Sequence, residues 1–138
     1  MGCRGLAGEI TGLGCCGCGC GAAVRQALDL GPGAIGQRAL TLGARLRGPL
    51  AGLPGITTHD LGQTRCAIVT AKIDRLEAEP AAAAPRRAAV NVSTTVPGDN
   101  PLDTQDRGVH PLIRFSPHYY NTEDDIDRAT ELVAALAS

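Results

Sequence analysis

The chain has 138 residues, of which 43% are hydrophobic and only 2% aromatic, and its formal net charge at pH 7 is -1. This length predicts one domain with an aliphatic core, and the near-neutral charge gives no electrostatic footprint for nucleic acid. No segment reaches the roughly 18 apolar residues that a membrane-spanning helix needs. We therefore expect a soluble cytoplasmic protein that binds neither nucleic acid nor membranes.

The amino-terminal third is predicted to be a leader followed by two helices. Residues 1–21 consist mostly of Gly, Cys and Ala, so we expect a disordered low-complexity leader, with the folded domain spanning residues 22–138. Residues 22–30 indicate a short helix, which the Gly31-Pro32-Gly33 breaker ends. Residues 34–53 carry apolar side chains at spacings of three and four, which is typical of an amphipathic helix.

The middle of the chain alternates between strands and breakers. Short strands are predicted within residues 53–61, 65–73 and 90–96, and Cys66 is expected to be a core residue of the second. Residues 74–89 have a helical composition, but Pro80 and Pro85 predict that this helix is broken into pieces. Residues 97–108 are rich in turn residues and are predicted to form a loop.

The last third contains an extended segment and the best-defined helix. Within residues 110–118 the alternation puts Ile113 and Phe115 on one side of a strand and Arg114 on the other. Thr122 or Asn121 is the expected N-cap of a helix whose first turn is acidic and whose apolar stripe is Ile126, Ala129, Val133 and Leu136. The order of elements predicts an α+β fold, in which helices cover one face of a small, mainly antiparallel or mixed sheet.

All the aromatic residues of the chain lie in "RFSPHYYNTEDDID", residues 114–127. The longer stretch "LIRFSPHYYNTEDDIDRATELVAAL" resembles the carboxy-terminal end of class V aminotransferases, the pyridoxal-phosphate (PLP) family that includes cysteine desulfurases and isopenicillin N epimerase-like enzymes. The stretch "ALDLGPGAIGQRALTLGARLRGPLAGLPGITTHDLGQTRCAIVTAKID" is similar to the run that precedes it in that family. The resemblance covers residues 22–136 and implies the small-domain fold of fold-type I PLP enzymes.

The resemblance assigns roles to individual residues. Arg114 matches the arginine that binds the α-carboxylate of the amino-acid substrate, and a guanidinium suits this role because it holds a carboxylate through two parallel hydrogen bonds. His118 is close enough in sequence to line the same cleft. Tyr119, Asn121 and Thr122 match a turn whose role is structural. The implied partners are the substrate carboxylate and a large PLP-binding domain, or a homodimer, in a parent transferase.

Two departures from the family pattern limit what this chain can do. In the family, a lysine of the large domain forms the Schiff base with PLP, whereas the only lysine here is Lys72, at the end of a predicted strand. We therefore expect a truncated, fragment-like chain that binds no cofactor and is inactive alone. The segment 93–103 also lacks the cysteine that would carry a persulfide, which favours transamination, epimerisation or a lyase step over desulfuration.

The cysteine cluster supports an alternative function. Cys15, Cys16, Cys18 and Cys20 lie within six residues, and four thiolates are the right number for a tetrahedral metal site. Structural zinc sites, however, prefer pairs of cysteines separated by a loop, so the spacing is unfavourable. The alternative hypothesis is a non-catalytic protein that handles metals or thiols through these four residues.

Overall fold

The computed structural model describes residues 13–60, 62–95, 98 and 111–137. Their helices and strands, in chain order, are α1 (Leu13–Leu30), α2 (Pro32–Gly52), β1 (Ile56–Thr58), β2 (Val69–Ile73), α3 (Ala78–Arg87), β3 (Ser93–Thr95), β4 (Leu112–Phe115) and α5 (Glu123–Ala137). The chain divides into two compact units, Met1–Ile35 and Gly36–Ser138. Within the described ranges, no helix combines the length and apolar composition that crossing a membrane requires.

The first unit contains helix α1, which begins inside the segment predicted as a leader and is longer than the helix expected from residue 22. It ends at the expected breaker. Gly31 adopts a positive φ of 86°, and its N–H donates to the carbonyl oxygens of Ala27 and Leu28. Glycine takes this left-handed conformation without the steric cost that a Cβ imposes, so helix α1 can stop here.

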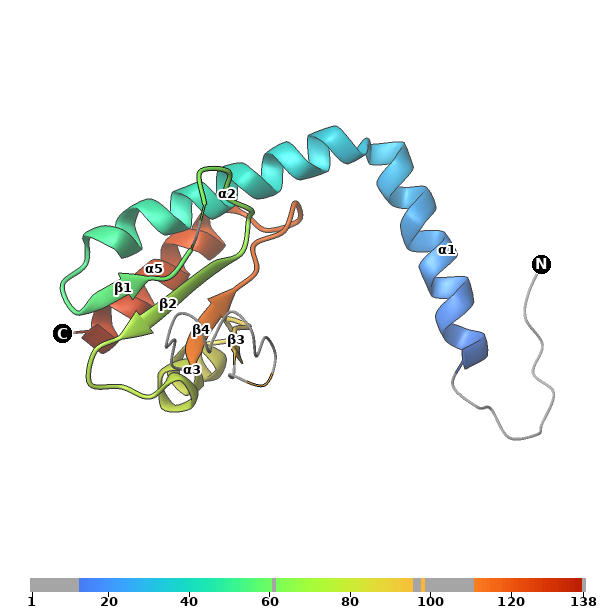
Figure 1. Ribbon diagram of the computed structural model, residues 1–138. Coiled ribbons are helices and arrows are strands. Elements are labelled where there is room, and N and C mark those ends of the chain that lie inside the picture. Colours follow the sequence, from blue (N-terminus) through green and yellow to red (C-terminus); the bar gives the residue numbers. More distant parts are fainter. Residues whose placement is uncertain (1–12, 61, 96–97, 99–110, 138) are drawn as a thin grey trace. The chain divides into compact units, whose positions relative to one another are not determined.

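The second unit contains a four-stranded antiparallel sheet in the order β1-β2-β4-β3 (Figure 1). Val69 pairs with Phe115 and Ala71 with Ile113, and all four of these side chains are buried. They form one core with apolar residues of the three helices of this unit, namely Leu42, Leu46 and Leu50 of α2, Ala81 and Ala82 of α3, and Ile126, Ala129 and Val133 of α5. The predicted α+β fold, with helices covering one face of an antiparallel sheet, is confirmed.

The prediction that Pro80 and Pro85 break the helix into pieces was wrong, because α3 is continuous. Pro80 lies in the first turn, where a backbone N–H has no partner within the helix, so its missing donor costs nothing there. Pro85 lies in the last turn and its ring is fully buried. The helix ends just afterwards, where Ala89 adopts a positive φ of 60°.

Helix α2 approaches the β1–β2 connection very closely at Gly43. A Cβ at this position would lie 2.7 Å from the carbonyl oxygen and 2.9 Å from the Cα of Ala67. Four residues further on, Arg47 donates to the carbonyl oxygens of Cys66 and Ile68. Cys66 is itself exposed, so the expected core role was wrong. Strand β2 begins at Val69 and not at residue 65, so Cys66 lies in the connection, where its carbonyl oxygen accepts from Arg47 and its thiol contacts the carbonyl oxygen of Ile68 at 3.8 Å.

Two ion pairs connect helix α2 to the start of helix α5. Arg38 pairs with both carboxylate oxygens of Glu123 and also donates to the carbonyl oxygen of Asn121. One turn further along α5, Arg45 binds Asp127 through Nε and a terminal nitrogen, at 2.8 and 2.5 Å. The Arg38 hydrogen bond is the main reason why the pKa of Glu123 falls to about 2. These pairs fix the amino-terminal end of α5, and therefore the turn that precedes it.

The close approach at Gly43 predicts opposite effects for two glycine-to-alanine changes in α2. Gly43→Ala should lower the free energy of unfolding by about 1 to 3 kcal/mol, because the added methyl group meets rigid backbone. Gly36→Ala should be neutral or stabilising by up to about 1 kcal/mol, since nothing lies within 4 Å of its Cβ position and alanine favours helix. Urea unfolding of both variants checks this. Equal stability of the two would show that α2 does not pack on Ala67 as described.

The ion pair of Glu123 predicts a pH-dependent contribution to stability. Its pKa is lowered from an ordinary value of 4.5 to about 2, so the contribution is complete above pH 4.5 and is lost as the pH falls towards 2. Arg38→Met should therefore be less stable than the wild type at neutral pH, and the difference should disappear in this acidic range. Thermal unfolding between pH 7 and pH 2 measures it.

The matched control is Arg87→Met, which removes the same charge from an exposed position of α3 that has no ion-pair partner among the described residues. Its effect on stability should be small throughout the pH range. A stability loss in Arg38→Met that stays constant with pH would contradict the assignment to Glu123.

Candidate functional site

Residues of the sheet that point away from the helices form a mostly polar surface, which we call the open sheet face and which also contains the buried Leu112 of β4. Strand β4 alternates so that Ile113 and Phe115 are 2% and 4% exposed while Arg114, between them, is half-buried. Residues that pair across antiparallel strands share a face. The register therefore assigns to the open sheet face Arg114, its partners Thr70 and Ser93, and the neighbouring pair Lys72 and Thr57.

Arg114 is the central residue of this face. Its two cross-strand neighbours, Thr70 and Ser93, are small and uncharged. Four other arginines form ion pairs, namely Arg38, Arg45, Arg47 and Arg86. In the part of the chain that the structure describes, Arg114 forms none. Strand β4 thus holds the guanidinium of Arg114 between two buried side chains, Ile113 and Phe115. Among the described residues, no carboxylate neutralises its charge.

The turn after strand β4 is built from hydrogen bonds that the sequence partly predicts. The side-chain oxygen of Asn121 accepts from the backbone N–H of His118 at 2.9 Å. Thr122 and Asp125 cap each other: the Thr122 hydroxyl accepts from the Asp125 N–H, and the Asp125 carboxylate accepts from the Thr122 N–H. This reciprocal arrangement confirms Thr122 as the N-cap of α5. The hydrogen bonds from Thr122, chiefly the backbone one, hold the pKa of Asp125 below its ordinary value.

The clustered aromatic residues divide between the core and the turn. Phe115 is buried, whereas Tyr120 is 71% exposed. The rings of His118, Tyr119 and Tyr120 contact one another, with centroids 4.8 to 5.5 Å apart. Phe115 therefore anchors the strand of Arg114 in the core, whereas the two tyrosines lie in the turn that follows it.

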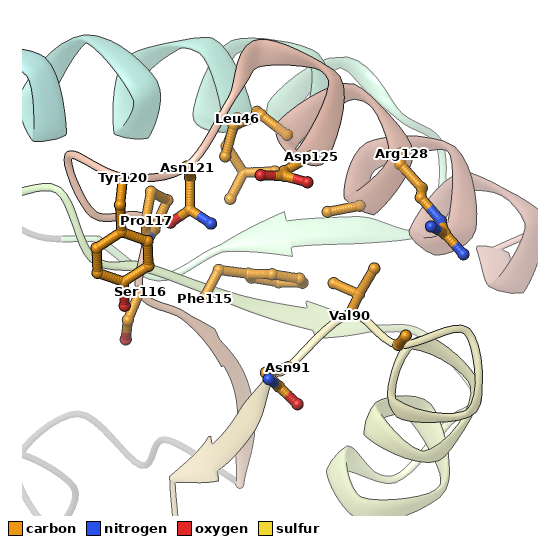
Figure 2. A pocket seen from close by; sticks show the side chains of 13 residues that line it. Leu46, Val90, Asn91, Phe115, Ser116, Pro117, Tyr120, Asn121, Asp125 and Arg128 are labelled. Carbon is orange, nitrogen blue, oxygen red and sulfur yellow. The ribbon is translucent and has the colours of Figure 1, made fainter.

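A pocket of about 390 Å³ lies on the helix side of the sheet. Figure 2 shows Phe115 on its floor, with Tyr120 and Asn121 at one end and Arg128 at the other. Arg128 donates to the carbonyl oxygen of Ala88 at 2.7 Å. Neither Arg114 nor His118 lines this pocket. A smaller one, of about 230 Å³, is lined by Arg47, His59, Asp60, Arg65, Cys66, Ile68 and Thr70.

The other predicted site residues are only partly described. The backbone of Cys15, Cys16, Cys18 and Cys20 lies in helix α1, but the side chains of the first three are outside the described residues. Cys20 is exposed. Across the described residues, no group of three or more potential metal ligands from His, Cys, Asp and Glu comes together. Most of the segment 93–103, predicted as a loop without a persulfide cysteine, also lies outside them.

Residues that the sequence did not single out also shape the site. Ser93 and Thr70 were not recognised as neighbours of Arg114, because strand register cannot be read from short strands of this composition. Lys72 was expected at a strand end, but it lies in strand β2 on the same face as Arg114. The alternation of apolar and polar residues in "VTAKI" was the available signal for this placement.

Comparison with known proteins gives a match at the level of structure alone. No protein-family description and no curated protein matches the sequence. Solved structures do match. Two of them are the apo cysteine desulfurase from Thermococcus onnurineus NA1, with a TM-score of 0.77 and 18% identity, and the cysteine desulfurase CsdA (S-sulfonic acid) from Escherichia coli, with a TM-score of 0.71 and 19% identity.

The matches extend over most of this chain but only a small part of the solved ones. They cover 84% and 83% of this chain, and 29% and 28% of the two cysteine desulfurases. At this level of identity the likeness concerns the fold. Most of this chain therefore has the fold of one part of a cysteine desulfurase, and it spans less than a third of the length of those enzymes.

Proposed function

We propose that this chain forms the substrate-recognition part of a PLP-dependent enzyme of the class V aminotransferase type, in which Arg114 binds the α-carboxylate of an amino acid. Two independent lines support the proposal. The stretch from residue 112 to 136 resembles the end of that family's chains, and the fold is similar to part of two cysteine desulfurases. The resemblance in sequence and the similarity in structure agree on the same portion of such an enzyme.

The observation that carries the proposal is the environment of Arg114. Burial of Ile113 and Phe115 anchors the strand on both sides of the arginine, so the guanidinium starts from a rigid backbone. No carboxylate among the described residues forms an ion pair with it. A guanidinium that is half-buried and lacks an acidic partner attracts an external anion, and its planar fork fits both oxygens of a carboxylate.

The surroundings of Arg114 favour orientation of the ligand. Thr70 is held by Asp60, whose carboxylate accepts from both the Thr70 backbone N–H and its hydroxyl. The capped start of α5 and its ion pairs with α2 fix the turn that carries His118. His118 is exposed in that turn, which is compatible with its proposed role as a second residue lining the substrate cleft.

The cofactor chemistry belongs to a partner under this proposal. PLP requires a lysine within an enclosed site, but Lys72, the only lysine of the sequence, lines neither of the two pockets described above. The residues present therefore do not fit the cofactor, and we assign no reaction step to them. A large PLP-binding domain, with or without a second copy of the enzyme, would cover the open sheet face and provide the reacting groups.

The reaction class proposed for the parent enzyme is transamination, epimerisation or a related lyase step. Desulfuration is disfavoured because the segment 93–103 contains no cysteine to accept sulfur. The two similar solved structures are both cysteine desulfurases, and their activity is not assigned to this chain. Arg114 serves any of these reactions equally, because each acts on a substrate that carries an α-carboxylate.

Carboxylate binding by the chain itself tests the proposal. Titration of the labelled protein with L-alanine, followed by NMR, should shift the backbone amides of residues 113–115, with a Kd on the order of millimolar for one charge-assisted pair. L-alaninamide should not shift them, because it has no carboxylate. Arg114→Gln should abolish the response to alanine.

The control for this titration is Arg87→Gln, which removes the same charge from an exposed position on helix α3. It should bind alanine as the wild type does. If Arg114→Gln and the wild type respond equally to alanine, Arg114 is not the carboxylate-binding residue and the proposal is wrong.

A further inference from the structure

We infer that Lys72 recognises a second anionic group of the ligand that Arg114 holds, so that the open sheet face selects amino acids with an acidic side chain. The inference rests on the proposed function and narrows its substrate class. It is carried by the position of Lys72 relative to Arg114, by the charges around the two side chains, and by the different geometry of their cationic groups.

The strand register makes Lys72 a diagonal neighbour of Arg114. Thr70 lies directly opposite Arg114, and Lys72 follows Thr70 by two residues on the same strand and therefore on the same face. Diagonal positions across an antiparallel pair are about 7 to 8 Å apart, within reach of long side chains. Lys72 is half-buried, and its partner on strand β1 is Thr57. The two cations can therefore converge on one small ligand.

No acidic side chain in the described part of the chain compensates for this pair of like charges. The carboxylate of Asp60, which reaches Thr70, is already bound to the buried Arg47. Asp74 is exposed just beyond the end of strand β2 and forms no ion pair with Lys72. Two neighbouring cations repel each other in the empty protein, and a ligand with two negative groups relieves the repulsion.

The two cationic groups suit different parts of such a ligand. The fork of Arg114 orients a carboxylate through two parallel hydrogen bonds, which suits the α-carboxylate. The ammonium of Lys72 is a compact charge on a flexible stem, so it can follow side-chain carboxylates at slightly different distances. The chemistry of the face thus favours aspartate- or glutamate-like ligands over neutral amino acids.

The test compares matched amino acids in NMR titrations of the full chain. L-aspartate should bind about fivefold more tightly than L-asparagine, and L-glutamate about fivefold more tightly than L-glutamine, because each pair differs by one surface-exposed ionic contact. Lys72→Met should remove this preference while keeping the weaker binding of asparagine and glutamine. Lys72→Arg should restore the preference, and Arg87→Met, the remote control, should leave it unchanged.

The outcomes separate this inference from the proposed function. A wild type that binds acids and amides equally, or a Lys72→Met variant that keeps the preference, overturns the role of Lys72 while leaving the role of Arg114 intact. Both roles are supported if Arg114→Gln loses all amino-acid binding and Lys72→Met still binds amino acids but no longer prefers the acids over the amides. Binding of neither acids nor amides by the wild type overturns both.

Discussion

The buried side chain of Arg47 connects the helices to the sheet, and the arrangement of the second unit depends on it. Arg47 is only 9% exposed, and its guanidinium donates to the carboxylate of Asp60 and to the carbonyl oxygens of Cys66 and Ile68. Asp60 in turn binds the backbone and hydroxyl of Thr70. Removing such a cation from water is costly, and only a complete set of partners offsets that cost. The network therefore tolerates one position of α2 relative to β2, and through β2 it sets which residues stand beside Arg114.

The two faces of the sheet carry different kinds of side chain. The helix side contains the aliphatic core, which supplies the stability of the unit through Leu46, Val69, Ile113 and their neighbours. The open sheet face contributes little to that core and bears hydroxyls and two cations. Because the aliphatic core and the polar side chains lie on opposite sides of the same strands, the polar face can change its charges without disturbing the packing. Alternation along strand β4 makes this separation possible within four residues.

Local patterns in the sequence were sufficient for most of the elements and for part of the candidate site. The leucine spacing of α2, the cap of α5 and the alternation around Arg114 each depend on residues within one or two turns or strand positions. The ion pair between Arg38 and Glu123 joins residues 85 positions apart, and no local pattern reveals such a pair. The integrity of α3 was missed because the tolerance for Pro80 and Pro85 depends on where the helix begins and ends. The placement of Lys72 beside Arg114 required the register between β2 and β4. The paired residues Thr70 and Arg114 lie 44 positions apart in the chain, and local periodicity does not encode such a register.

The outer strands of the sheet, β1 and β3, are only three residues long. The edge of a sheet offers unpaired backbone groups to any other extended chain, and long edges invite sheets of different molecules to join. Just beyond the end of β1, the backbone N–H of Thr70 donates to the carboxylate of Asp60. A side chain therefore satisfies a backbone group that a further strand could otherwise bind. Edge strands this short limit the length over which a second molecule could add to the sheet, and so act against fibrous self-association.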